Sequence, residues 1–87
     1  MPDRPLTAAE LRVLRAAARG DLYRSESGFS LYDSFIRGER RKVNATVDRL
    51  TSRTDRLLSI GEQQGTSRPW HLTDAGRAEL AKHPEES

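Results

Sequence analysis

The sequence predicts a small α+β fold with a three-helix core, a two- to three-stranded antiparallel hairpin and a short C-terminal helix. Apolar residues recur at helical spacing near the amino terminus and again in the middle of the chain. Two short apolar runs, 57–60 and 70–72, flank a polar segment with two glycines, as in a hairpin with a long tip. Because 87 residues with 34% hydrophobic letters support only one thin core, we expect a single domain over 1–87, ordered over about 6–82.

The first helix is predicted to begin after Thr7 and to end at Gly20. Thr7 can cap it, Glu10 three residues later completes a capping box, and glycine favours the left-handed stop at the other end. The apolar stripe predicted to face the core consists of Leu11, Leu14, Ala17 and Ala18.

Residues 21–38 allow two interpretations. A short helix could begin near Ser30 and end at Gly38, or the strand Leu22–Ser25 could pair with Phe29–Tyr32 in a hairpin. We favour a short strand at the start of this segment followed by a short helix. In either case its aromatic and aliphatic side chains are expected in the core.

Residues 39–53 are predicted to form a basic amphipathic helix. Val43, Val47 and Leu50 lie at i, i+4 and i+7, and this stripe is expected to pack on the first helix. The stretch 37–56 holds seven of the fifteen basic residues of the chain. Most of these are arginines, which suit forked contacts to phosphate and guanine.

A hairpin and a last helix complete the pattern. Leu57–Ile60 and Trp70–Leu72 read as antiparallel strands, and Pro69 is expected to confine the second strand to an edge of the sheet. Thr73 is predicted to cap a short helix that turns Ala75 and Leu80 inward.

Three helices with an attached hairpin are the arrangement of the winged helix-turn-helix domain, whose basic helix enters the DNA major groove. Over about 39–82 the chain resembles the winged module of MarR-like regulators. The residues that carry the resemblance are the helix end Val47, Arg49 and Leu50 and the phrase Leu72, Thr73, Gly76, Arg77 and Leu80. The resemblance implies a small transcriptional regulator with a wing at 61–68.

The sequence departs from that family at two points. Arg53, Thr54, Asp55 and Arg56 stand where a glycine commonly ends the helix. The long dimerisation helices of the family are also not expected here, so its dimerisation mode and ligand pocket are not implied, and a homodimer is left open.

The candidate contacts follow from residue type. Arginine can fork to guanine and asparagine to adenine, and alanine allows close approach to a thymine methyl group. The candidate base contacts are Arg41, Asn44, Ala45 and Asp48. The candidate phosphate contacts are Arg37, Arg40, Lys42, Arg49, Ser52 and Arg53, with Gln63, Gln64, Thr66, Ser67 and Arg68 in the wing. Asp48 could accept from a cytosine amine, but an interaction within its own helix with Arg41, Lys42, Arg49 or Ser52 is favoured.

Other chemistry has little support. The chain has no cysteine and only two histidines, so we expect no catalytic residues, metal, cofactor or small-molecule ligand. No run approaches about 18 apolar residues, and no secretory signal precedes Leu6, so a cytoplasmic, nucleoid-associated protein is expected. The expected partner is double-stranded DNA. The alternatives are a winged-helix adaptor that binds proteins and an architectural or recombination accessory protein of a mobile element.

Overall fold

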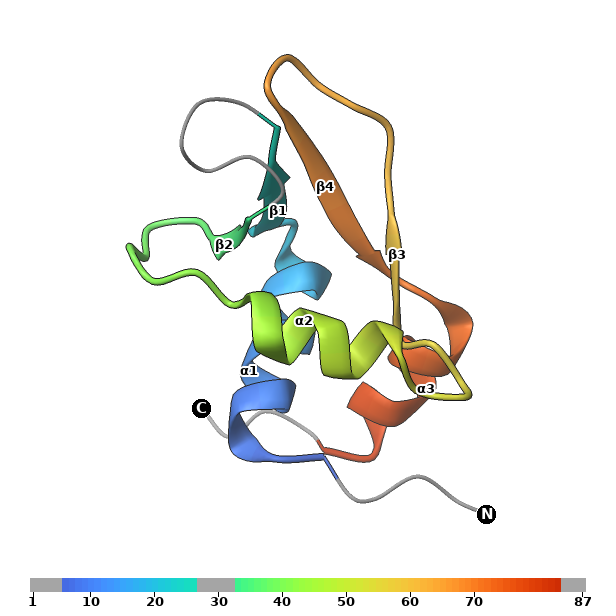
Figure 1. Cartoon of the computed structure of the whole chain (residues 1–87). Helices are drawn as coiled ribbons and strands as arrows, with labels where there is room; N and C mark the ends of the chain where they lie inside the picture. The colour runs from blue at the N-terminus through green and yellow to red at the C-terminus, as the bar shows by residue number, and fades with distance from the viewer. Residues whose placement is uncertain (1–5, 27–32, 84–87) are drawn as a thin grey trace.

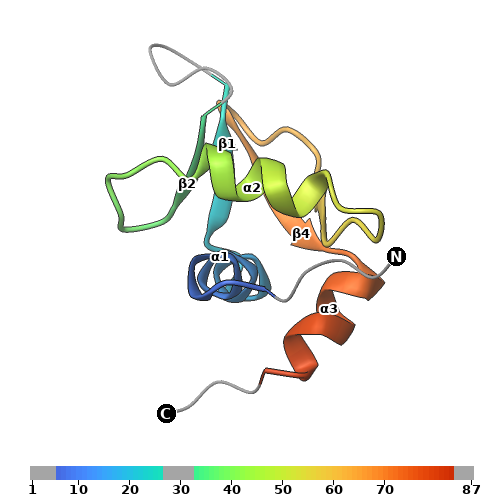
Figure 2. The ribbon, with the colours of Figure 1, turned by 60° about the horizontal axis from the view of Figure 1, so that its bottom comes forward.

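The computed structural model describes residues 6–26 and 33–83 and shows an α+β fold with three helices and a four-stranded antiparallel sheet. The elements are α1 (Ala8–Arg19), β1 (Leu22–Ser25), β2 (Ser34–Ile36), α2 (Asn44–Thr51), β3 (Leu58–Ile60), β4 (Ser67–Leu72) and α3 (Asp74–Ala81). The strand order is β2-β1-β4-β3. Helix α2 lies across one face of the sheet, and α1 and α3 pack near one end of it (Figures 1 and 2). The predicted α+β class is confirmed.

Helix α1 has the predicted ends. The Thr7 hydroxyl accepts from the Glu10 N–H at 3.1 Å, and the Glu10 carboxylate accepts from the Thr7 N–H at 2.9 Å. Gly20 ends the helix with a φ of 80°. The predicted apolar stripe is only partly correct, because Leu11 is half-buried and Ala18 is exposed. The buried apolar side chains are Val13, Leu14, Ala16 and Ala17. The buried face is shifted because α1 is wedged between α2, α3 and the strands β1 and β4.

The prediction of a short helix after β1 is wrong for the residues that the structure describes. Ser34–Ile36 is a strand that pairs with β1, with Phe35 opposite Tyr23. The predicted strand near Leu22 is confirmed, whereas Phe29–Tyr32 lies outside the described residues. The hydroxyl of Ser34, which is buried, accepts from the Trp70 indole N–H at 3.0 Å, so a residue far along the chain helps to hold β2. Over residues 33–43, therefore, no helix precedes α2.

Helix α2 is shorter than the predicted 39–53. The chain enters it in extended form, because Lys42 bridges to Phe35 and the Val43 N–H donates to the Ser34 carbonyl at 2.8 Å. The apolar stripe is as predicted: Val47 and Leu50 are buried, and Val43 packs against the core from its edge. Helix α2 contacts α1, again as expected.

The predicted hairpin is present as β3 and β4, but Pro69 does not lie at an edge, since β4 pairs with β1 on one side and β3 on the other. The Pro69 carbonyl accepts from the Gly61 N–H at 2.7 Å, so the side on which proline lacks an N–H faces β3. The Arg68 Nε atom donates to the Gly61 carbonyl at 2.9 Å. An arginine side chain thus replaces the donor that proline lacks, and the strand can stay inside the sheet.

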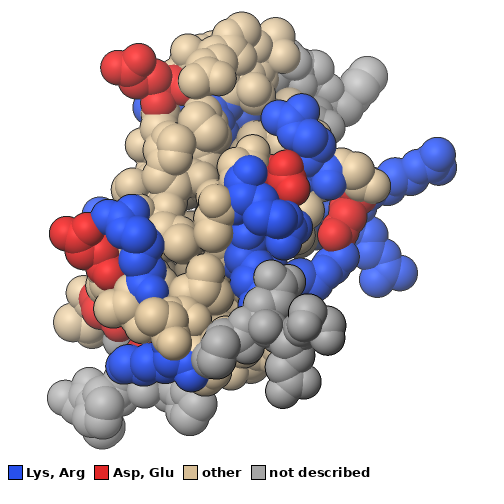
Figure 3. Space-filling model, turned by 180° about the vertical axis from the view of Figure 1, so that it is seen from behind, with Lys and Arg blue, Asp and Glu red and all other residues tan. Residues whose placement is uncertain are grey.

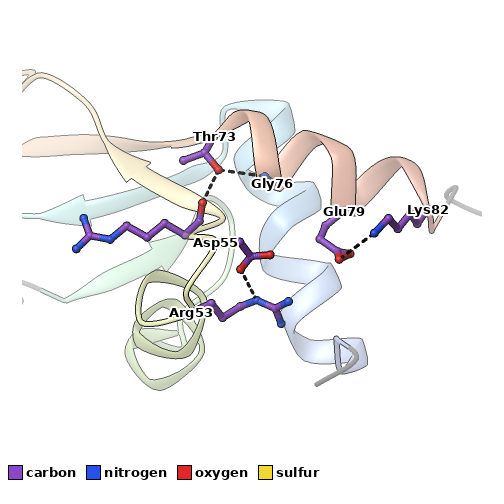
Figure 4. Close-up of polar contacts among 7 residues, drawn as sticks. Arg53, Asp55, Thr73, Gly76, Glu79 and Lys82 are labelled. Carbon is purple, nitrogen blue, oxygen red and sulfur yellow. Dashed lines mark hydrogen bonds and ion pairs between the residues drawn. The ribbon is translucent and has the colours of Figure 1, made fainter. Parts of the chain in front are cut away.

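Strand β4 leads directly into α3. Thr73 caps the helix as predicted, since its hydroxyl accepts from the Gly76 N–H at 3.0 Å and donates to the Arg56 carbonyl (Figure 4). Gly76 is buried, and a Cβ atom there would overlap the Leu57 carbonyl oxygen and lie 3.1 Å from the Leu57 carbonyl carbon. Ala75 and Leu80 pack against the core, as predicted. The glycine therefore sets how closely α3 approaches the start of β3.

Candidate nucleic-acid interface

The outer side of α2 is the centre of the candidate interface. Four exposed residues follow one another along this side at spacings of three, one and three: Ala45, Asp48, Arg49 and Ser52. The opposite side of the helix carries Val47 and Leu50, which are 2% and 0% exposed. The apolar side thus fixes the helix to the protein, and in Figure 2 no other labelled helix or strand covers the outer side of α2.

The predicted basic residues before Asn44 are not on the helix. Arg40 and Arg41 are exposed at its amino end, and neither makes an ion pair with another described residue. Lys42 and Arg37 are directed elsewhere. Lys42 forms an isolated β-bridge with Phe35, and the Arg37 guanidinium lies 5.9 Å from the centre of the Tyr23 ring. Tyr23 and Phe35 are opposite one another in the sheet and point to the face away from α2. Lys42 and Arg37 therefore lie on that face as well.

The side chains of two predicted contact residues, Asn44 and Arg53, are engaged in interactions within the protein. The Asn44 side chain accepts from the Ser34 N–H at 2.6 Å and donates to the Asp33 carboxylate at 2.7 Å, which joins the start of α2 to β2. The Arg53 side chain is only 9% exposed and pairs with Asp55 at 3.0 Å (Figure 4). Neither side chain has the freedom that a base or phosphate contact needs.

The interaction of Asp48 within its own helix, favoured from the sequence, is not found among the described residues. Arg49 instead donates to the Thr46 hydroxyl at 3.2 Å, and its Nε atom lies 3.9 Å from the fully buried Glu10 carboxylate. The Asp48 carboxylate therefore stays on the exposed side of α2. The capping box indicated one role for Glu10, but its burial beneath an arginine of α2 could not be seen from the sequence.

At the tip of the β3–β4 hairpin, only some of the predicted contact residues are exposed. Gln63, Gln64 and Thr66 are exposed, whereas Ser67 is half-buried. The amide of Gln63 donates to the Gly65 carbonyl at 3.1 Å, which shapes the tip. The Arg68 Nε atom is held by Gly61, so the main role visible for this arginine is structural.

A cleft of about 470 Å³ lies between the carboxyl end of α2 and the hairpin. Its lining residues include Thr51, Ser59, Trp70 and the exposed Arg56. The three polar residues among them were missed from the sequence, although Arg56 belongs to the basic stretch 37–56. The Thr51 hydroxyl donates to the Asp48 carbonyl at 3.1 Å, so the exposed Arg56 is the donor at the junction of helix and hairpin.

Among the described residues, no group of three His, Cys, Asp or Glu side chains comes together, and no helix has the length and apolar character to cross a membrane. Comparison with protein-family models, with curated proteins and with solved structures finds no match to this chain. The functional argument therefore rests on the surface of α2 and its surroundings.

Proposed function

We propose that the protein binds double-stranded DNA by placing the exposed side of α2 in the major groove. The observation that carries this proposal is that the outer side of α2 is exposed and, apart from Ala45, polar, while Val47 and Leu50 anchor its inner side. An α-helix with its side chains is about 10–12 Å in diameter and the major groove is about 12 Å wide, so the eight-residue helix α2 fits the groove. Arg40 and Arg41 would lie at its amino end, near phosphate oxygens.

The β3–β4 hairpin would act as a wing beside this helix. The cleft lined by Thr51, Arg56 and Ser59 lies between them, and the guanidinium of the exposed Arg56 suits a phosphate of the DNA backbone. Gln63, Gln64 and Thr66 at the tip could then reach the next phosphate or the minor groove. The fold would be a winged-helix variant in which the hairpin β1–β2 takes the place of the first helix of the helix-turn-helix.

Sequence preference would come mainly from Ala45 and Asp48. Alanine allows contact with a thymine methyl group, and a carboxylate in the major groove accepts from the cytosine amine. Such a preference suits a small transcriptional regulator. A protein-binding adaptor would need apolar anchors on the exposed side of α2, and Ala45 is the only apolar residue among its four exposed side chains.

A matched pair of variants tests the proposal. Ala45→Glu puts a negative charge on the exposed side of α2, and Ala78→Glu puts the same charge on an exposed position of α3. We expect the first to weaken duplex binding by tenfold or more and the second to have little effect, measured by fluorescence anisotropy with a labelled duplex. The logarithm of the parent's binding constant should also fall linearly with the logarithm of the salt concentration, with a slope of about −0.9 per neutralised phosphate. Equal affinities of the two variants, or a flat salt profile, would refute duplex binding through α2.

A further inference from the structure

The face of the sheet opposite α2 carries a row of side chains that the proposed duplex interface does not use. We call it the central row, and it consists of Lys42, Phe35, Tyr23, Pro69 and Gly61, each opposite the next across the strands. Residues paired in this way point to the same side of a sheet. The other side is the packed one, because Leu22, Ile36 and Leu58 from neighbouring positions are buried in the core.

The middle of the central row consists of the partly exposed rings of Tyr23, Phe35 and Pro69. The rings of Tyr23 and Phe35 lie with centroids 5.9 Å apart and planes inclined by 32°, and both residues are partly exposed. Pro69 continues the surface next to Tyr23. A Cβ on Gly61 would lie 3.0 Å from the Pro69 ring and 2.5 Å from the His71 imidazole, so glycine leaves room for these two rings at this end of the row.

Positive charge borders the row at the β2 side. The Arg37 guanidinium lies over the Tyr23 ring, and the side chains of Arg37 and Lys42 are 72% and 65% exposed. Each is 3.9 Å from a carboxylate, Asp21 or Asp33, but both carboxylates have closer partners. Asp21 accepts from Arg19 at 3.1 Å and Asp33 from Asn44 at 2.7 Å. Seen from behind in Figure 3, an uncharged expanse is bordered by basic side chains with some acidic ones among them.

We propose that this sheet face binds single-stranded nucleic acid, with bases stacked on Tyr23 and Phe35 and the backbone beside Arg37 and Lys42. Aromatic rings on a sheet bind bases by stacking, and neighbouring cations track the phosphates. Strands lie about 4.8 Å apart, so the two rings can serve two successive bases. The row contains no carboxylate, which suits a polyanion. The site lies on the opposite side of the sheet from α2 and does not depend on duplex binding.

The ring variants Tyr23→Leu and Phe35→Leu test stacking, because leucine keeps apolar volume but has no flat face. The probes are a labelled 12-nucleotide oligothymidylate and an abasic oligonucleotide of the same length, titrated by anisotropy. We expect the parent to bind the oligothymidylate more tightly, and each variant to lose about fivefold or more on it alone. Trp70 lies on the opposite side of the sheet, with its indole bonded to Ser34, so its emission reports whether a variant is folded.

The two lysines of the chain give a matched test of charge. Lys42 and Lys82 are 65% and 68% exposed, and each has one acidic neighbour. Lys42→Gln should weaken binding of the oligothymidylate, whereas Lys82→Gln should not. If a ring variant unfolds, the lysine pair and Arg37→Gln, which replaces an exposed side chain, decide the question.

Other outcomes overturn the proposal. It fails if the parent binds the abasic oligonucleotide as tightly as the oligothymidylate, or if folded ring variants bind like the parent. It also fails if sedimentation shows a dimer that Tyr23→Leu dissociates while no oligonucleotide binds, because a second copy would then occupy the face. Ala45→Glu separates the two proposals, since it should remove duplex binding and leave oligothymidylate binding intact.

Discussion

Replacing Gly76 with alanine should destabilise the protein, although the same replacement inside most helices is stabilising. Alanine is favoured over glycine in a helix by about 1 kcal/mol. Here the added Cβ would overlap the Leu57 carbonyl oxygen, which also accepts from the Thr73 N–H at 3.2 Å. The contact is with backbone rather than with a side chain that could rotate away. Forcing extra volume into such a site costs about 3 kcal/mol, so the net loss should be about 2 kcal/mol.

Thermal unfolding followed by circular dichroism measures this effect. For a chain of this size, 1 kcal/mol corresponds to about 4–8 °C, so Gly76→Ala should lower the Tm by about 8–16 °C. The control is Ala78→Gly, at an exposed position of the same helix, which should lose only the helix-propensity difference of about 1 kcal/mol. A higher Tm for Gly76→Ala than for the parent would show that α3 does not approach β3 as described.

Three further substitutions test other parts of the structure. Val47→Asp places an unpaired carboxylate at a position that is 2% exposed, and we expect the cooperative unfolding transition to disappear in a calorimetric scan; a native-like transition would contradict the assignment of the buried side of α2. Asn44→Ala leaves the Ser34 N–H without its acceptor and should cost about 1–3 kcal/mol in urea unfolding, with no change in duplex sequence preference. Arg68→Ala removes the donor to the Gly61 carbonyl and should cost about 1–2 kcal/mol, whereas unchanged stability would mean that the bond is not formed in solution.

Local features of the fold could be predicted from the sequence. The cap at Thr7 with Glu10, the left-handed Gly20 and the cap at Thr73 each depend on residues within a few positions of one another. The buried stripe of α2 follows from residue spacing alone, and Val47 and Leu50 are buried as predicted. These features are determined by residues that lie close to one another in the sequence.

The features that could not be predicted depend on distant partners. The sequence favoured a short helix through Ser34 up to Gly38, whereas the structure has a strand there, which is held by β1 and by Trp70, 36 positions away. The start of α2 depends on the bonds of Asn44 to residues 10 and 11 positions earlier. The charge of Arg53 suggested a surface contact, but its side chain is enclosed by the fold. The candidate site is therefore smaller than the sequence suggested and centred on fewer residues.

The use of an arginine side chain to complete the hydrogen bonding of a strand makes two adjacent positions interdependent. With valine at position 69, a main-chain N–H would reach Gly61 and the guanidinium of Arg68 would become redundant there. The cost of losing Arg68 should accordingly shrink in a Pro69→Val background, so that the two changes are not additive. Released from the sheet, the same arginine would add a cation near the end of the hairpin, where selection could recruit it for binding.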